Sequence, residues 1–264
     1  MGQKDFQPRK WQADVEAEGT LNGEPIHWHV PEEAPVALVY GGINHVVMLA
    51  TPANLEDFAT GFTITEGIAD GAADIRAIEV REKAQGIDLL ITLADAPQER
   101  FELRHTRRNM VGRTGCGLCG IDSMEQLFQK VTPVADTPKA LEETSVQKAV
   151  EAFAGQQPLK QLNKSVHGAA WVSAAGEIML VREDVGRHNA LDKLIGALVH
   201  DGTDLADGFV LVSSRASYEM AQKCVAVGAR AMVSLSAPTA FTIRLAREAN
   251  FTLANWSKGG LVTF

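Results

Sequence analysis

Short apolar runs alternate with one-sided helical patterns through the second half of this 264-residue chain. The runs "FVLVSS" (209–214) and "AMVSLS" (231–236) have the length and continuous apolarity of strands buried on both faces. Each is followed by a segment whose apolar residues recur three or four apart, "SYEMAQKCVAVG" after the first and "TAFTIRLAREA" after the second. This alternation predicts right-handed crossovers and a largely parallel sheet with helices on both faces.

Three further segments extend the predicted α/β domain. "GAAWVSAAGEIMLVRED" (168–184) is typical of a strand, a small turn and a second strand. "HNALDKLIGALV" (188–199) has the one-faced apolar spacing of a helix, and "FTLANW" (251–256) is the last expected strand.

The first half predicts a smaller α+β region. "PVALVYGGINHVVMLATP" (35–52) contains two β-rich runs around glycines and is expected to form a hairpin. "LEDFATGFTITEG" (55–67) follows a Thr-Pro helix-start signal, and "IRAIEVRE" with "IDLLITLAD" predicts a second strand pair. Residues 131–145 are rich in Pro, Asp and Thr, which is typical of a linker. We therefore expect an N-terminal region over 1–135 and a C-terminal domain over 136–264.

Charge and cysteine content limit the classes of protein to which the chain can belong. The formal net charge of -8 argues against general nucleic-acid binding. Three cysteines do not make a disulfide framework at this length, so a cytoplasmic protein is expected. The first residues lack the apolar core of a secretory signal, and no apolar run approaches the roughly 20 residues needed to cross a bilayer. The expectation is a soluble protein that uses no membrane.

The stretch "VGRTGCGLCG" (111–120) places Cys116 and Cys119 two residues apart among glycines. A thioredoxin-like redox pair should open a helix directly after a strand, whereas this glycine-rich surrounding favours a mobile loop. A zinc site needs two more ligands, and Cys224 lies on the apolar face of a predicted helix. A third reading is a thiol on a flexible arm, because arginines flank the pair and cations stabilise a thiolate. These arginines are Arg104, Arg107, Arg108 and Arg113. The residues alone leave all three readings open, together with a purely structural pair.

Two other charged stretches stand beside predicted helix starts. In "EDVGRHNALDK" (183–193) the simple interpretation is a solvated helix end with intrahelical ion pairs. In "VSSRASYE" (212–219), backbone N–H groups and Arg215 could bind an anion, or Ser214 or Ser217 could merely cap the helix. Because ligands bind at the carboxyl ends of parallel strands, Arg187, Arg215 and Lys258 are expected to gather there.

Four long motifs occur together in this chain, "RTGCGLCG", "EDVGRHNALDKLIG", "SSRASYEM" and "SLSAPT". Their order and spacing resemble the FdhD family of sulfur carriers required for active formate dehydrogenase. "PVALVYGGINHVVMLATP" and "GFTITEG" match the N-terminal half of that family, so the resemblance covers nearly the whole chain.

The resemblance implies a sulfurtransferase. A cysteine desulfurase would load Cys116 as a persulfide, with Cys119 as its loop partner, and the sulfur would pass to the molybdenum bis(molybdopterin guanine dinucleotide) cofactor of formate dehydrogenase. GDP would be a partial mimic of that cofactor. The family's cofactor-binding run falls on Trp256, Ser257, Lys258, Gly259, Gly260 and Leu261, where apolar Leu261 departs from the family's frequent basic character. The resemblance also suggests a homodimer. The alternative function is a non-catalytic chaperone that binds the cofactor.

The family is similar in fold to cytidine deaminases, which implies a three-layer C-terminal domain. Deaminases bind zinc through His-x-Glu and Pro-Cys-x-x-Cys motifs at two helix starts. Here Ala190 takes the place of the catalytic glutamate, and Ser214 and Ser217 replace two cysteine ligands. We therefore expect neither deaminase chemistry nor a bound metal.

Overall fold

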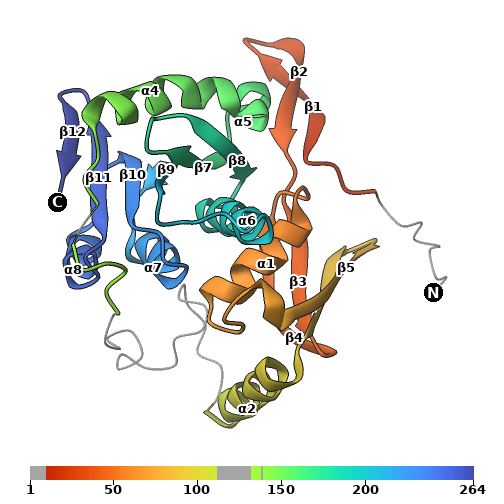
Figure 1. Ribbon diagram of the computed structural model, residues 1–264. Coiled ribbons are helices and arrows are strands. Elements are labelled where there is room, and N and C mark those ends of the chain that lie inside the picture. Colours follow the sequence, from red (N-terminus) through yellow and green to blue (C-terminus); the bar gives the residue numbers. More distant parts are fainter. Residues whose placement is uncertain (1–9, 112–131, 138) are drawn as a thin grey trace.

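The computed structural model describes residues 10–111, 132–137 and 139–264. Their strands form three sheets, which are a two-stranded hairpin, a four-stranded sheet and a six-stranded sheet (Figure 1). The four-stranded sheet belongs to the N-terminal half, and the six-stranded sheet belongs to the C-terminal half. The fold is therefore a mixed α/β fold, as expected from the sequence.

The six-stranded sheet has the strand order β12-β11-β10-β9-β7-β8. Its strands are β7 (His167–Ser173), β8 (Ile178–Asp184), β9 (Gly208–Arg215), β10 (Ala231–Ser236), β11 (Thr252–Ser257) and β12 (Gly260–Thr263). Only the pairings β9–β10 and β10–β11 are parallel, whereas β7–β8, β7–β9 and β11–β12 are antiparallel, so the expectation of a largely parallel sheet was wrong. The reason is that β7–β8 and β11–β12 are hairpins with short turns, which force antiparallel pairing.

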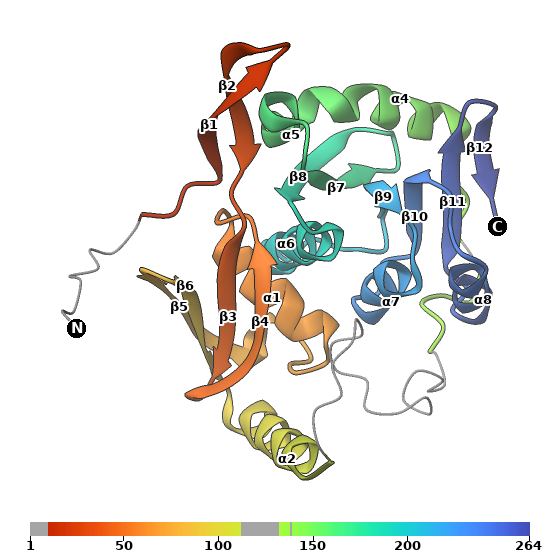
Figure 2. The ribbon, with the colours of Figure 1, turned by 180° about the vertical axis from the view of Figure 1, so that it is seen from behind.

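Helices cover both faces of this sheet (Figure 2). Apolar residues of α6 (Arg187–His200), α7 (Tyr218–Ala226) and α8 (Ala240–Glu248) form one buried cluster with Trp171, Val210 and Met232 of the sheet. The other face packs against α4 (Glu143–Phe153), which is followed by η2 (Ala154–Gln156) and α5 (Pro158–Asn163). The predicted helices 188–199, 217–228 and 239–249 are thus confirmed, and the domain has three layers.

The N-terminal sheet has the order β4-β3-β6-β5, built from β3 (Ala34–Tyr40), β4 (Ile43–Ala50), β5 (Ile75–Lys83) and β6 (Gly86–Leu93). Both predicted strand pairs are confirmed, because β3–β4 and β5–β6 are antiparallel. Helix α1 (Leu55–Thr65) buries Phe58 and Phe62 against this sheet, and α2 (Asp95–Val111) contributes Phe101. The short helix η1 (Ala72–Asp74) precedes β5.

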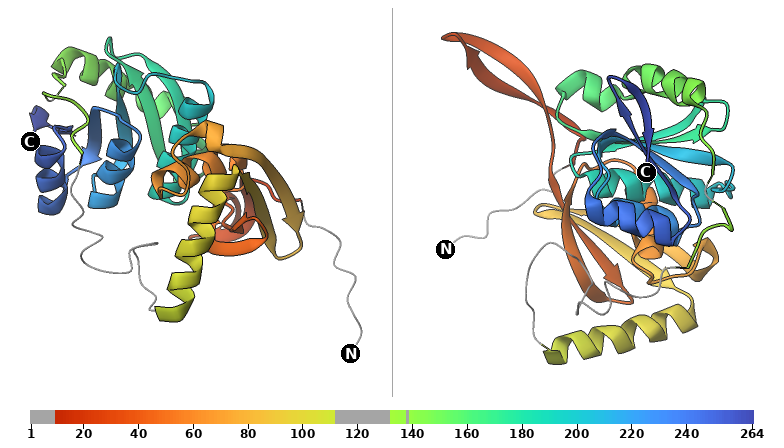
Figure 3. Two further views of the ribbon diagram at one scale, coloured as in Figure 1. Left: turned by 60° about the horizontal axis from the view of Figure 1, so that its bottom comes forward. Right: turned by 90° about the vertical axis from the view of Figure 1, so that its left-hand side faces the viewer.

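Several elements differ from the sequence expectations. The β1 (Asp14–Leu21) and β2 (Glu24–Pro31) strands form an unexpected hairpin that projects from the body of the molecule (Figure 3). Strand β12 follows the strand that was expected to be the last. Helix α4 begins at Glu143, inside the expected linker, because Val146, Ala149 and Phe153 supply a buried helical face.

The two halves meet where α1 crosses α6. A Cβ atom added to Gly61 would overlap the carbonyl oxygen of Asp192, and one added to Gly196 would overlap that of Asp57. Glycine on both helices therefore allows the two backbones to touch. Within the described part of the chain, no helix is long and apolar enough to cross a membrane.

Candidate functional site

One edge of the six-stranded sheet collects the chain segments that carry the predicted binding residues. The parallel strands β9, β10 and β11 end at this edge, and antiparallel β7 begins there with His167, which pairs with Asp184 at the end of β8. Helices α6 and α7 start just beyond it. In α/β proteins the carboxyl ends of parallel strands are the usual ligand-binding edge, so the topology favours a site here.

The predicted residues Arg187, Arg215 and Lys258 all lie along this edge. Arg187 is the first residue of α6, Arg215 ends β9, and Lys258 lies in the β11–β12 turn. Strand β10 separates the strands of Arg215 and Lys258, so their backbones are about 10 Å apart. Arg187 lies beyond β7 on the other side of Arg215. The edge therefore spreads these three cations over several strands and does not bring them into one cluster.

The run Trp256 to Leu261 forms the β11–β12 hairpin. The Ser257 hydroxyl accepts a hydrogen bond from Gly259 N (3.2 Å) and donates one to Gly260 O (3.1 Å), which fixes the turn. Trp256 and Leu261 pack against the cluster under α4, whereas Lys258 and Gly259 are exposed. The turn residues Lys258 and Gly259 are thus the most exposed part of this run.

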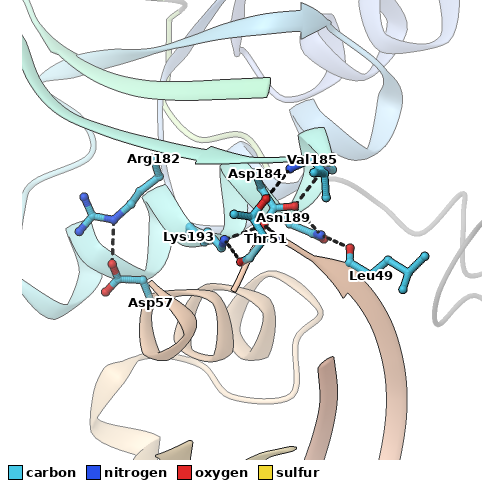
Figure 4. A network of polar contacts seen from close by, with 9 residues as sticks. Leu49, Thr51, Asp57, Arg182, Asp184, Val185, Asn189 and Lys193 are labelled. Atoms are coloured by element: carbon cyan, nitrogen blue, oxygen red, sulfur yellow. Dashed lines mark hydrogen bonds and ion pairs between the residues drawn. The ribbon is translucent and has the colours of Figure 1, made fainter. Parts of the chain in front are cut away.

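The start of α6 is fixed by the buried carboxylate of Asp184 (Figure 4). It accepts hydrogen bonds from Gly186 N (2.8 Å) and from the side-chain amide of Asn189 (3.0 Å) on one oxygen. Its other oxygen accepts one from Thr51 N of the N-terminal half (2.9 Å). Asn189 also donates to Leu49 O (2.8 Å). The turn that presents Arg187 is thus built jointly by both halves.

Lys193 completes this network as its buried cation. Its Nζ lies 2.6 Å from Asp184 Oδ2 and donates to Thr51 O at 2.8 Å, and neither charged side chain is accessible to solvent. Burial lowers the pKa of Lys193, and the neighbouring Asp184 opposes that effect. Nearby, Arg182 Nε of β8 lies 2.8 Å from Asp57 Oδ2 of α1. The pairing across the domain interface makes this region a structural connection between the halves.

A second buried ion-pair group joins α7 to α1. Lys223 Nζ lies 2.9 Å from Glu66 Oε1 and 3.0 Å from Asp192 Oδ2, and it donates to the Thr65 hydroxyl. Burial raises the pKa of Asp192 to about 6, although Lys223 opposes this shift. The interpretation of residues 183–193 as a solvated helix end was therefore wrong, because Asp184, Asp192 and Lys193 are buried and pair with other segments.

Four buried polar atoms near the same edge have no hydrogen-bond partner among the described residues. They are Gln157 Nε2, Arg187 Nε, His188 Nε2 and Ser217 Oγ. Ser217 is the N-cap residue of α7 but makes no side-chain cap, and Ser214 donates to Arg215 O instead. The simple capping interpretation was therefore wrong. Since buried polar groups are almost always hydrogen-bonded to protein or to water, these atoms are available to bind water or a ligand.

Cations of two helices, Arg187 of α6 and Lys223 of α7, lie near this cluster. Burial, together with Arg187 and Lys223, lowers the pKa of His188 to about 4, while Glu219 opposes them. The pKa of His167 is also lowered, first by burial and then by Lys160 and Arg187. Two helix N-termini add partial positive charge at the same place. The arrangement suits an anion of the phosphate class and disfavours a free cation.

The predicted sulfur-transfer residues Cys116 and Cys119 lie outside the described residues. Of the arginines that precede them, Arg104 donates to Gly67 O (2.8 Å), which ties α2 to the end of α1. Cys224 is buried, and burial raises its pKa to about 12, so it is not a reactive thiolate. The described residues contain no group of His, Cys, Asp and Glu side chains that could hold a metal.

Sequence reasoning missed Gln157 and His167 as site residues and treated His188 only as part of a charged helix end. His188 follows Arg187 directly in a glycine-preceded helix start, which was a usable signal for an anion site. Gln157 and His167 carried no such signal. They reach the edge only because α5 and β7 fold back beside β8 and β9.

Comparisons with known proteins agree on one family. A family model described as FdhD/NarQ family matches residues 31–263. The chain is 48% identical to "Sulfur carrier protein FdhD" of Bordetella bronchiseptica over 89% of this chain and 84% of the relative. It is 49% identical to the protein of the same name from Cupriavidus necator over 88% of this chain and 79% of the relative.

A solved structure shows the same fold at lower sequence identity. The crystal structure of a candidate formate dehydrogenase accessory protein from Desulfotalea psychrophila has a TM-score of 0.74 and is 21% identical in sequence. The match covers 95% of this chain and 96% of that chain. With the family match over most of the sequence, these findings show that the chain belongs to the FdhD/NarQ family.

Proposed function

We propose that this protein is a sulfur carrier for formate dehydrogenase. In this proposal Cys116 accepts sulfur from a cysteine desulfurase and delivers it to the molybdenum bis(molybdopterin guanine dinucleotide) cofactor. The cofactor is the substrate of the carrier and is bound through its guanine nucleotide ends. Support comes from the relatives named sulfur carrier protein FdhD and from the unpartnered cluster at the sheet edge.

The sulfur step balances with the two cysteines of the loop. The Cys116 thiolate attacks the outer sulfur of the donor's persulfide, an S–S bond forms on Cys116, and the donor leaves as a thiolate. Release of that sulfur as hydrosulfide needs two electrons, which the Cys119 thiolate supplies when it attacks Cys116 Sγ. The products are hydrosulfide and a Cys116–Cys119 disulfide, which a cellular thiol then reduces.

The proposed binding of the nucleotide is supported by the unpartnered hydrogen-bond donors at the sheet edge. Arg187 Nε and Ser217 Oγ are buried donors without partners among the described residues, and they lie at the starts of α6 and α7. Diphosphate oxygens would satisfy both groups and complement both helix dipoles. Arg215 and Lys258 are exposed farther along the edge, where they can meet the remainder of a nucleotide.

Mass analysis after sulfur loading tests the proposed transfer. Incubation with a cysteine desulfurase and cysteine should add whole sulfur atoms that a thiol reductant removes. We expect the Cys116→Ala variant to lose this mass and the ability to mature formate dehydrogenase. The Cys224→Ala variant is the control, because that buried thiol should carry no sulfur. Wild-type maturation by Cys116→Ala would instead favour a cofactor-binding chaperone.

Nucleotide binding is tested separately by thermal shift and calorimetry. GDP should stabilise the folded protein more than ADP does, since a ligand of the folded state raises stability by mass action and the two bases differ in hydrogen bonding. The Arg215→Ala variant should bind GDP about tenfold more weakly through loss of a charge-assisted contact. Equal binding of GDP and ADP, unaffected by Arg215→Ala, would reject this binding site and leave sulfur loading intact.

A further inference from the structure

His188 connects the two helix starts at the sheet edge. It is the second residue of α6, and its Nε2 lies 3.9 Å from Glu219 Oε2, in the first turn of α7. Ser217 precedes Glu219 by two residues, so its unpartnered hydroxyl belongs to the same corner of the molecule. The imidazole is about one third exposed, but its Nε2 atom is buried and lacks a hydrogen-bond partner among the described residues.

The charges that face His188 come from three elements. Arg187 on its own helix, Lys223 on α7 and His167 on β7 all oppose a second proton on the imidazole. Glu219 on α7 is the one favourable charge, and its distance of 3.9 Å is too long for a hydrogen bond. In the empty protein His188 is therefore neutral at pH 7, with its pKa lowered to about 4.

An anion at this corner would reverse that balance. A dianion beside Arg187 Nε and Ser217 Oγ offsets the positive charges that disfavour protonation of His188. It also offers the oxygen atoms that the buried Nε2 lacks. A protonated imidazole donates hydrogen bonds from both ring nitrogens. Its hydrogen bond to an anion is charge-assisted and therefore stronger than that of a neutral ring.

We propose that His188 is a proton-linked ligand of this anion site, which holds a phosphate-class dianion together with Arg187 and Ser217. The inference rests on the proposed function, which places the diphosphate of the substrate at this edge. Binding then takes up a proton on His188, and affinity rises as the pH falls. Release of the anion returns that proton, so substrate exchange and proton exchange are coupled.

Sulfate is the probe for the direct test, because it remains a dianion over the pH range in which histidine titrates. The Cε1–H signals of the histidines are followed by NMR from pH 4 to 8, with sodium sulfate or with sodium chloride at equal ionic strength. The His188→Gln variant identifies the signal of His188. We expect sulfate to raise the pKa of His188 by about one unit or more, which equals a tenfold preference for the protonated site.

His200 serves as the internal control, because it is an exposed histidine at the opposite end of α6. Its pKa should not change between sulfate and chloride. An unchanged pKa of His188 in sulfate, or equal shifts of His188 and His200, would overturn the proposal.

Nucleotide affinity provides a second measurement. Between pH 6 and pH 4.5, where a pKa raised from about 4 would be crossed, wild type should gain more GDP affinity than His188→Gln does, and the nucleotide's own titration is common to both proteins. Equal gains in the two proteins would contradict the proton linkage. Sulfur loading of Cys116 is measured separately in the wild-type protein by mass analysis, so a failed linkage is distinguished from a failed sulfur carrier.

Discussion

The segment 183–193 contains buried polar groups that have partners and, close to them in sequence, buried polar atoms that have none in the described structure. Asp184 and Lys193 are inaccessible to solvent, and they bind each other and the backbone of Thr51. Arg187 and His188 lie between them in sequence, yet each keeps a buried nitrogen without a partner in the described structure. The paired groups hold the two halves of the protein together. The unpaired groups could form hydrogen bonds with a ligand, and those bonds would add to the free energy of binding.

Removal of the satisfied cation should have the largest effect on stability. The Lys193→Met variant leaves Asp184 as an uncompensated buried charge, which should lower the free energy of unfolding by about 3–5 kcal/mol. Urea unfolding measures the change. The control is Lys148→Met, whose partner Glu177 is 3.3 Å away in an exposed pair and whose loss should cost about 0–1 kcal/mol.

A double variant keeps this prediction testable if Lys193→Met does not fold. Asp184→Asn combined with Lys193→Met removes both charges, so it should be more stable than Lys193→Met alone. If Lys193→Met and Lys148→Met lowered the free energy of unfolding by the same amount, the buried network would not hold the halves together.

A smaller effect should appear in the pH dependence of stability. Because the folded state lowers the pKa of His188 below the unfolded value of 6.5, the unfolded chain binds the proton first as the pH falls. The contribution of His188 to stability should therefore decrease from pH 6.5 to pH 4, whereas buried Asp192, whose pKa is raised to about 6, contributes with the opposite sign. His188→Gln should remove part of this decrease, on the order of 1–2 kcal/mol after allowance for partial exposure.

Denaturant unfolding at several pH values measures this effect. His167 contributes with the same sign, so part of the decrease should remain in the variant. His200→Gln should follow the wild-type curve. Parallel curves for wild type and His188→Gln would mean that His188 is not held in a neutral state.

The smallest stability effect is expected for the unpartnered hydroxyl. Ser217→Ala should change the free energy of unfolding by less than about 0.5 kcal/mol, because Ser217 makes no cap. Its GDP affinity should fall about three- to tenfold through loss of one hydrogen bond.

Thr239 is the matched control, because it caps α8 by accepting a hydrogen bond from Thr242 N. Thr239→Ala should cost about 1 kcal/mol of stability and leave GDP binding unchanged. If Ser217→Ala behaved like Thr239→Ala in both measurements, the hydroxyl would be structural.

Hydrophobic periodicity was sufficient to predict most of the fold. Together with short apolar runs, it identified the strands from β3 to β11 and the helices α1, α6, α7 and α8, because the helices bury one face and central strands such as β9 are buried on both. The β1–β2 hairpin was missed since its residues are largely exposed and show no apolar face. Its Asn22-Gly23 turn, with both φ angles positive, was nevertheless a strong hairpin signal in the sequence.

The site was less predictable because its partners are distant in sequence. Local charge suggested ion pairs within the helix at 187–200, but Lys193 pairs with Asp184 and the carbonyl group of Thr51. Sequence pattern shows which charges exist, and only the fold shows which groups they face. The cysteine loop remains a prediction, since its function was inferred from residue type and family resemblance.

The close crossing of α1 and α6 has a mechanical consequence. With backbone in contact at Gly61 and Gly196, and ion pairs on either side, the two halves cannot slide past each other or open as a hinge without breaking buried contacts. The separation between the sheet edge proposed to bind the nucleotide and the start of α2 is therefore fixed in the folded protein. If the proposed sulfur transfer requires a movement within the protein, that movement must therefore occur in a segment outside this interface.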